Sequence, residues 1–458
     1  DTGSGTDGAG VVLAPGEILD LEAGDDGVLA AEIATPAGDE QLVLQIVSAS
    51  LASQTEHDYA VTVDGEELGA PDEEGPISEP PPRAGLPGAL DAAMAAVAAG
   101  AEAARLRAEP PDVGDVIPLY IDGGAGVVTI DAEVLEVTEA LVLCVDRTTS
   151  PDLDLDEAIV DQVTADFADV VLPRERAIFG EESDVNGDER VTLLLSPLVY
   201  EGSGGAAAYV YPCDLLEPGS VGCPYSNAME LIYLSPPDLL PAHMGTAKAI
   251  TETVAHEFQH AIYFYRKFVA NEMPTAHESV YVTEGFSALA QDLSGFQAGN
   301  RYVAAAAIEG AGDVSMGDVL EHGPGYDMTN DGVLRGAGYL LYRYAFERAG
   351  GAVFEADGGV TDGGGVALLA RIIDGEDTGA ASLEAALAAS AGEVAELSAP
   401  DLVEDLFTAM LLDDREIDPP PPFVESGAGF DDPTTDPVTG NPHGVTRSEE
   451  HTSELQSL

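Results

Sequence analysis

Two histidines spaced one helical turn apart carry the clearest chemical signal in this sequence. They frame the segment His256-Glu-Phe-Gln-His260, within a stretch from 246 to 270 that has no proline or glycine. Apolar residues recur there every four positions, which predicts a helix: Ile250, Val254, Phe258 and Ile262. Both imidazoles then share one helix face and can occupy two corners of a tetrahedral zinc site. Glu257 is placed to act on a metal-bound water and not to bind the metal.

The alternative interpretation of this segment is a helix with two surface histidines and a solvated glutamate. A third ligand would decide between the two, and a second predicted helix from Glu278 to Asp292 offers two acids. Glu284 follows His260 by 24 residues, enough for the chain to turn and return as an antiparallel helix. Glu278 competes with Glu284 for this role. A solvated face for Glu278 and a helix-start acid for Glu284 are the structural alternatives.

These segments resemble a known family of enzymes. Glu284-Gly-Phe-Ser287 resembles the Glu-x-x-Ser ligand segment of gluzincin metallopeptidases, and together with the His-Glu-Phe-Gln-His segment it resembles the hyicolysin-type secreted zinc metallopeptidases, over about residues 171–350. The resemblance implies a zincin-like fold in which His256, His260 and Glu284 bind Zn²⁺ and Glu257 is the general base.

The sequence departs from the family's pattern at two positions beside Glu284. Thr283 stands where the family has Asn, and Ala288 stands where relatives often carry an acid. Such an acid can orient a ligand histidine from outside the coordination sphere, so this support is in question here. The ligands themselves are all present.

The resemblance implies a secreted or surface-anchored zinc endopeptidase, a hydrolase acting on peptide bonds. A non-catalytic surface or adhesion protein that keeps a zincin fold is the alternative, and a zinc hydrolase acting on a non-protein amide is a third hypothesis. For the donor that would stabilise the oxyanion, Tyr339, Tyr326 and His322 are candidates by position only. Tyr339 fits a core position as well, and the other two fit a glycine-rich loop.

The composition excludes some partners. The chain has 84 Asp and Glu against 17 Lys and Arg, a net charge of −67. Such a surface repels nucleic acid and anionic membranes, and salt adaptation and a GC-rich genome both explain it. No apolar run approaches the length of a transmembrane segment. We expect a monomer whose partner is a protein or peptide substrate.

The domain organisation predicted from the sequence is α+β. An antiparallel β domain is followed by a catalytic domain whose first part is β-rich and whose last part is mainly helical. In chain order we expect a flexible spacer (1–10), an accessory β domain (11–70), a Pro-rich linker (71–88), a helix with the β-rich part (89–245), the zinc-binding helical part (246–412) and a disordered tail (413–446). Within the β-rich part, the helix starting at 154 should stop at Pro173.

The two ends of the sequence are unusual. Residues 1–10 resemble the spacer after a bacterial lipoprotein or secretory signal, which predicts an extracellular or cell-surface location with a possible lipid anchor upstream. Residues 447–458 resemble a translated sequencing adapter and are excluded from the fold prediction.

Two further features could bind or crosslink. Asp184, Asn186 and Asp188 alternate like the front of a Ca²⁺ loop, but Glu189 replaces the usual glycine and Leu195 the final glutamate. An Asx turn leading into a strand is the alternative. Cys213 and Cys223 can form a disulfide or remain free, and Cys144 reads as a buried thiol.

Overall fold

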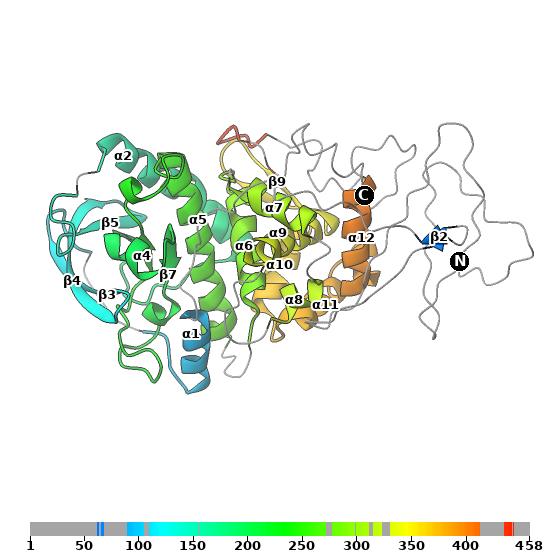
Figure 1. Cartoon of the computed structure of the whole chain (residues 1–458), viewed down its shortest axis with the longest axis horizontal. Helices are drawn as coiled ribbons and strands as arrows, with labels where there is room; N and C mark the ends of the chain where they lie inside the picture. Colours follow the sequence, from blue (N-terminus) through cyan, green and yellow to red (C-terminus); the bar gives the residue numbers. More distant parts are fainter. Residues whose placement is uncertain are drawn as a thin grey trace, which may run out of the picture.

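The fold is described from a computed structural model of the chain. It describes residues 62–63, 66–67, 89–104, 110–153, 155–271, 277–297, 299–310, 315–322, 330–412, 435–441 and 443. Within them the chain forms a mixed α/β structure, with a curled sheet at one end and a group of helices at the other (Figure 1). None of the helices described is both long enough and apolar enough to cross a membrane.

Six strands make up the sheet, in the order β3-β4-β5-β6-β8-β7. They are β3 (Val116–Asp122), β4 (Val127–Val137), β5 (Leu141–Asp146), β6 (Val191–Leu195), β7 (Ala208–Val210) and β8 (Leu231–Leu234). The pairs β3/β4 and β4/β5 are antiparallel, β5/β6 and β6/β8 are parallel, and β7 closes the edge antiparallel to β8. The strand at this edge is therefore β7.

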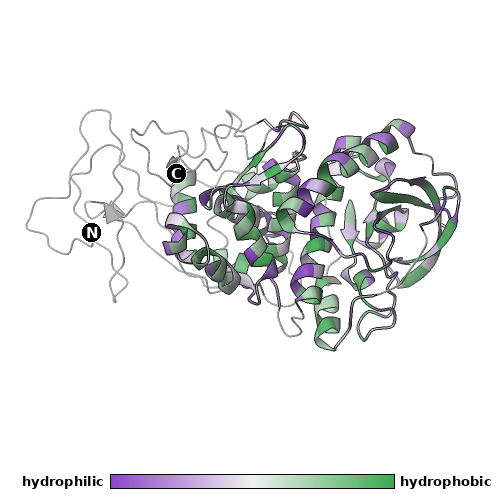
Figure 2. Cartoon of the chain, turned by 180° about the vertical axis from the view of Figure 1, so that it is seen from behind, coloured by the Kyte–Doolittle hydropathy of each residue, from purple (hydrophilic) through white to green (hydrophobic). Residues whose placement is uncertain are grey.

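The three central strands read as unbroken apolar runs because both of their faces are buried. Leu141, Leu143 and Val145 of β5 belong to the large core shared with the helices, whereas Val142 and Cys144 belong to a second core. That second core is formed with the curled β3–β4 end of the sheet and with α4 (Pro197–Gly202). Figure 2 shows green, hydrophobic residues along strands of the sheet. Cys144 is a buried free thiol, as predicted.

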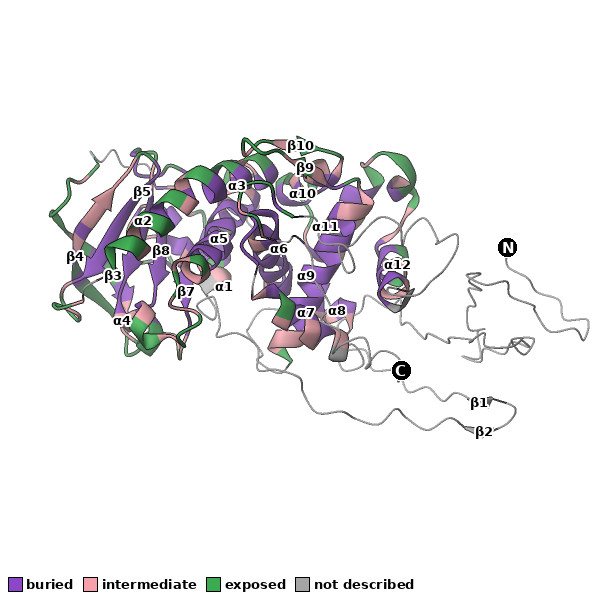
Figure 3. Cartoon of the chain, turned by 90° about the horizontal axis from the view of Figure 1, so that it is seen from above, coloured by how far each residue is buried: buried purple, intermediate pink, exposed green. Residues whose placement is uncertain are grey.

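A long helix, α5 (Ala247–Phe264), separates the sheet from the helical part and continues as a π-helical turn (Tyr265–Ala270). The helices beyond it are α6 (Val280–Leu293), α7 (Asn300–Glu309), α8 (Met316–Leu320), α9 (Asp331–Arg348), α10 (Gly365–Asp374), α11 (Gly379–Ala388) and α12 (Ala399–Leu412). The hairpin β9 (Ala352–Phe354) and β10 (Val360–Asp362) lies between α9 and α10 along the chain. Figure 3 shows α5, α6 and α9 buried over most of their length, so the centre of the molecule lies at these three helices.

The helix before β6 runs further than the sequence predicts. It comprises α2 (Glu157–Asp166), a π-helical turn (Phe167–Val171) and α3 (Leu172–Phe179), so Pro173 does not stop it. In the π-helical turn, the N–H of Leu172 donates to the carbonyl of Phe167, five residues back. The wider turn leaves room for the ring of Pro173, which would clash with a carbonyl in a regular α-helix.

The segments that precede the sheet are described only in part. Most of the predicted accessory domain at 11–70 lies outside the described residues. Within it, two short strands, β1 (Thr62–Val63) and β2 (Glu66–Glu67), pair antiparallel. The helix α1 (Ala89–Ala98) lies near a loop closed by a disulfide between Cys213 and Cys223. The predicted spacer, the linker and the adapter-like end lie outside the described residues.

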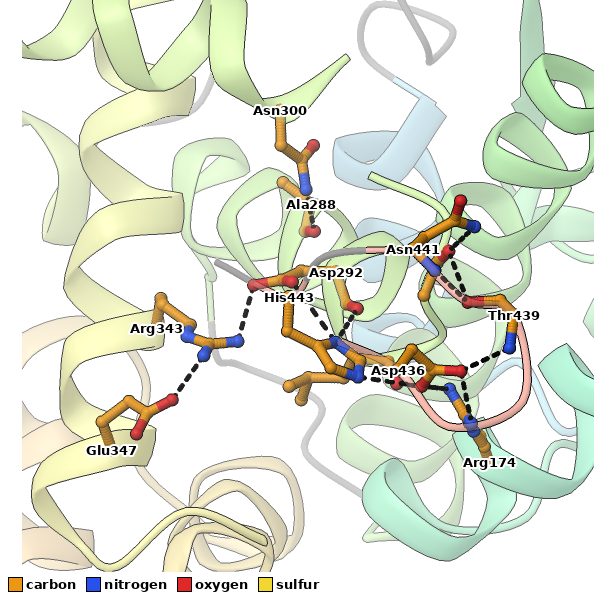
Figure 4. Close-up of polar contacts among 12 residues, drawn as sticks. Arg174, Ala288, Asp292, Asn300, Arg343, Glu347, Asp436, Thr439, Asn441 and His443 are labelled. Atoms are coloured by element: carbon orange, nitrogen blue, oxygen red, sulfur yellow. Dashed lines mark hydrogen bonds and ion pairs between the residues drawn. The ribbon is translucent and has the colours of Figure 1, made fainter. Parts of the chain in front are cut away.

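Residues 435–441 and 443, which we call the latch, fall in the tail predicted to be disordered, yet they dock onto the helical part. Arg174 of α3 donates to both carboxylate oxygens of Asp436, at 2.5 and 3.1 Å, with both side chains fully buried. His443 donates from Nε2 to Asp436 and from Nδ1 to the carbonyl of Asp292, each at 2.8 Å. Asp292 also accepts from Arg343 of α9 at 2.7 Å (Figure 4). The latch thus joins α3, the end of α6 and α9.

Candidate metal centre

The helix that carries both histidines begins at a side-chain cap. Thr246 accepts a hydrogen bond from the N–H of Ala249, which satisfies one of the free donors at the start of α5. From there the helical period places the rings of His256 and His260 on adjacent turns, with centroids 4.9 Å apart and planes at 79°. The predicted pairing of the two imidazoles on one face is confirmed, and the alternative of two surface histidines is not: His256 is 3% exposed.

The third residue comes from α6, which begins at Ser279, where the side chain accepts from the N–H of Tyr281. Glu284 Oε2 lies 3.3 Å from His256 Nε2, and Glu284 Oε1 lies 3.5 Å from His260 Nε2. The three ligand atoms are all within 4.8 Å of one another. Two imidazole nitrogens and one carboxylate oxygen form a donor set that can bind a divalent metal ion.

Unsatisfied polar atoms at this cluster provide a test of whether a cation fits. His256 Nε2 and Glu284 Oε2 are buried and make no geometric hydrogen bond among the described residues; the contacts of Glu284 Oε2 here are ion pairs with Arg335 Nε at 3.0 Å and His256 Nε2 at 3.3 Å. Buried polar atoms are nearly always paired, so groups of this kind need an explanation such as a missing ion. A divalent cation between the two side chains would satisfy both atoms, and the cluster therefore fits a metal.

Glu257 lies beside the cluster without taking part in it. It is fully buried, and neither of its carboxylate oxygens has a hydrogen-bond partner among the described residues. Burial raises the pKa of Glu257 to about 7, while the positive charge of His260 opposes this change and Glu284 adds to it. A carboxyl with a pKa near 7 can both accept and donate a proton at neutral pH.

Arg335 of α9 forms an ion pair with Glu284. Its Nε lies 3.0 Å from Glu284 Oε2. Burial alone would raise the pKa of Glu284, but Arg335 and the two histidines outweigh it and hold that pKa well below its ordinary value. Glu284 is therefore ionised, as a metal ligand must be. In the absence of a metal, burial lowers the pKa of His256, whereas for His260 the carboxylate of Glu284 overcomes burial and raises it.

Close packing of α6 on α9 brings Arg335 to Glu284. A Cβ added to Gly285 would lie 2.6 Å from the backbone of Gly338, and one added to Gly338 would lie 2.4 Å from the carbonyl of Tyr281. On the adjacent face of α9, a Cβ at Gly336 would lie 1.8 Å from the carbonyl of Val303 in α7. These three glycines allow the helix backbones to touch, which explains the Gly-x-Gly segment of α9 in physical terms.

Comparison with known proteins gives no family assignment. No family model matches the chain, and no curated protein is significantly similar to it. The likeness to hyicolysin-type metallopeptidases therefore depends on the residues of the site.

The structure decides between the two acids considered from the sequence. Glu278 does not reach the cluster, because its Oε2 accepts from Tyr263 Oη at 2.7 Å and its Oε1 accepts from the N–H of Gly379 at 2.9 Å. It is buried and structural, so a solvated face for Glu278 was wrong as well. Gln291 takes the supporting place that Ala288 leaves: its Oε1 lies 3.3 Å from His256 Nδ1, and its amide donates to the carbonyl of Glu252.

Two of the three residues proposed as oxyanion donors, Tyr339 and His322, are among the described residues. Tyr339 is fully buried and donates to Asp292 at 2.9 Å, so its core interpretation is confirmed. His322 stacks edge-on against Tyr281, with ring centroids 4.9 Å apart. Tyr326 lies outside the described residues. Sequence reasoning missed Arg335, because it lies 51 residues beyond Glu284 and has no spacing pattern that connects the two.

Replacing Glu284 should weaken zinc binding, whereas replacing Glu278 should not. Glu284→Gln removes a ligand and should weaken zinc binding by at least about 100-fold, the upper end of what loss of a supporting partner alone costs. Glu278→Gln should lower the melting temperature but leave the zinc affinity unchanged. Zinc competition with a chromophoric chelator measures both affinities. The assignment of the third ligand would be wrong if the Glu278 variant were the one that lost zinc.

Proposed function

We propose that the chain is a zinc-dependent endopeptidase of the gluzincin type, secreted or anchored at the cell surface, with a zincin-like catalytic domain. The observation that carries the proposal is the convergence of His256, His260 and Glu284 beside the buried carboxylate of Glu257, which is not part of the ligand set. A structural zinc site is normally closed by four protein ligands, whereas three ligands and a neighbouring carboxylate are typical of hydrolytic sites. The Cys213–Cys223 disulfide supports an oxidising, extracellular location.

His256, His260 and Glu284 would hold the ion, which when bound would lower the pKa of a coordinated water to about 7 and polarise the substrate carbonyl. Glu257 accepts the proton of the attacking water and then delivers it to the leaving amine. Gln291 holds the imidazole of His256 through Nδ1, and Arg335 keeps Glu284 ionised. Burial of Glu257 and the ligands excludes bulk water from the proton transfer.

An extended peptide has a place to bind beside these residues. β7 pairs only with β8 among the described strands and packs against α5; its three residues are buried, and its other edge is the one that a substrate strand would pair with. The backbone of Val210 in β7 also acts on the pKa of Glu257, so this edge lies next to the general base. Addition of a substrate strand to a free sheet edge is a common mode of peptide recognition.

A peptide-library digest combined with metal analysis tests this function. The purified chain should contain one zinc per molecule and cleave internal peptide bonds; 1,10-phenanthroline should abolish cleavage and added zinc should restore it. N-methylation of the backbone next to the cleaved bond should slow hydrolysis, because it removes the donors that pair with β7. A chain that binds zinc yet cleaves nothing in the library would favour the non-catalytic surface protein.

A further inference from the structure

The loop between α3 and β6 has the backbone of a cation-binding loop. The N–H of Glu189 donates to Asp184 Oδ1 at 3.1 Å, and the N–H of Asp188 donates to Asn186 Oδ1 at 3.2 Å. The N–H of Arg190 donates to Asp188 Oδ1 at 2.9 Å. In each of these bonds a side-chain oxygen accepts from a backbone N–H of the same loop. The carboxylates of Asp184 and Asp188 use only Oδ1 in them, so Oδ2 of each remains available for a cation. We propose that this loop, residues 184–190, binds a Ca²⁺ ion together with Glu230; the proposal is independent of the peptidase function.

The sequence departs from the calcium-loop pattern at two positions. The first is Glu189, which stands where the pattern has glycine, and the backbone conformation in the structure accounts for it. The sixth position of such a loop is normally glycine because the chain turns sharply there. Glu189 nevertheless has φ = 58°, the left-handed conformation that glycine usually supplies, and Gly187 has φ = 75°. This conformation is sterically unfavourable for a residue other than glycine, and Glu189 adopts it nevertheless.

The second departure is the absence of a glutamate at position twelve, where Leu195 stands. Glu230, next to the start of β8, brings a carboxylate to the loop from another part of the chain. Its Oε1 accepts from Ser183 Oγ at 2.6 Å and from the N–H of Val185 at 2.9 Å, so the carboxyl group is directed at the residues on either side of Asp184. The N–H of Thr192 donates to the carbonyl of Glu230 at 2.7 Å, which fixes this position beside the strand that follows the loop.

The other oxygen of Glu230 is the observation that points to a ligand. Glu230 is 2% exposed, and its Oε2 is buried with no hydrogen-bond partner among the described residues. A divalent cation among Asp184, Asp188 and Glu230 would satisfy the unpaired oxygen and neutralise three neighbouring carboxylates.

The donor atoms favour calcium. All the side-chain donors are oxygens, with no imidazole or thiolate, which disfavours zinc. Ca²⁺ accepts six to eight oxygen ligands in a flexible geometry, whereas the smaller Mg²⁺ requires near-ideal octahedral geometry, so a loop of this kind suits Ca²⁺ better.

Calcium titration of the full chain, held at one equivalent of zinc, tests the proposal. Isothermal titration calorimetry in 0.5 M KCl should show one saturable Ca²⁺ site with a Kd of about 10⁻⁴ M, typical of extracellular modules, and Mg²⁺ should not replace it. High salt suppresses the diffuse attraction of cations to so acidic a chain. Asp184→Asn should raise the Kd for Ca²⁺ at least tenfold, and Glu230→Gln should do the same without changing the zinc content.

The control is Glu181→Gln, which removes one negative charge from an exposed residue three positions before Asp184. Its Kd for Ca²⁺ should equal that of the wild type. Because Asp184 is itself exposed, its amide variant should fold normally, and thermal melts without Ca²⁺ check this. Absence of a saturable site in the wild type, or equal effects of the Asp184 and Glu181 variants, would overturn the proposal.

Discussion

The Glu257→Gln variant is expected to hold zinc as tightly as the wild type and to hydrolyse peptides about 10²–10⁴ times more slowly, the usual contribution of a general base. Glutamine keeps the size of the side chain but cannot accept a proton from water. Neither carboxylate oxygen of Glu257 has a hydrogen-bond partner to lose, so the fold should tolerate the change. Initial rates on a cleaved peptide, together with zinc content and melting temperature, measure the effect.

A second buried glutamate on the same helix supplies the control. Glu252 lies upstream on α5, where its Oε1 accepts from the N–H of Gly299, a bond that an amide oxygen can also accept. Glu252→Gln should therefore change the peptidase rate by less than about threefold. Equal rates for wild type and the Glu257 variant would remove Glu257 from the mechanism and favour the surface-binding hypothesis.

The part of the site on a single helix could be predicted from the sequence, because helical geometry alone fixes how His256, Glu257 and His260 lie. The choice of Glu284 over Glu278 was left open, since it depends on where α6 begins and on how it packs. The cap at Ser279 settles the first point and the contact of Gly285 with Gly338 the second. Predicting that contact requires knowing that α6 and α9 are neighbours, which no periodicity within either helix reveals.

The features that were missed come from distant or short segments. Arg335 reaches the site only through the packing of α9. The edge strand β7 is three residues long, which is too short for its side chains to show a period in the sequence. The latch was predicted to be disordered because its Pro, Asp and Gly content is typical of disordered chains, and such composition does not reveal that Asp436 has a buried arginine partner.

Breaking the latch is expected to cause the largest loss of stability among the changes considered. Asp436→Asn leaves Arg174 fully buried with half of its charge-paired contact gone, and removing one partner of a buried ion pair costs about 3–5 kcal/mol of unfolding free energy. Phe354 packs against both Arg174 and His443, so the loss should spread to the β9–β10 hairpin. Chemical denaturation of wild type and variant gives the difference in free energy.

An exposed Asp–Arg pair elsewhere in the chain provides the matched control. Asp374 accepts from Arg266 at 2.7 Å, but its side chain is 44% exposed, so Asp374→Asn should cost at most about 1 kcal/mol. If both variants lost the same small amount, the latch would not be docked in solution.

The latch should also make stability depend on pH through His443. Contacts with Asp292 and Asp436 outweigh burial and raise the pKa of His443 to about 9, above its unfolded value of about 6.5. A group whose folded pKa is raised stabilises fully below the unfolded pKa, and this contribution disappears as the pH rises through the folded pKa. The penalty of His443→Asn should therefore be greatest near pH 6, by about 3 kcal/mol over its value at pH 9.5 or above. A penalty that stayed constant over this range would mean that His443 is not charged in the latch, and the ion pairs that join α3 to α6 would then depend on Arg174 alone.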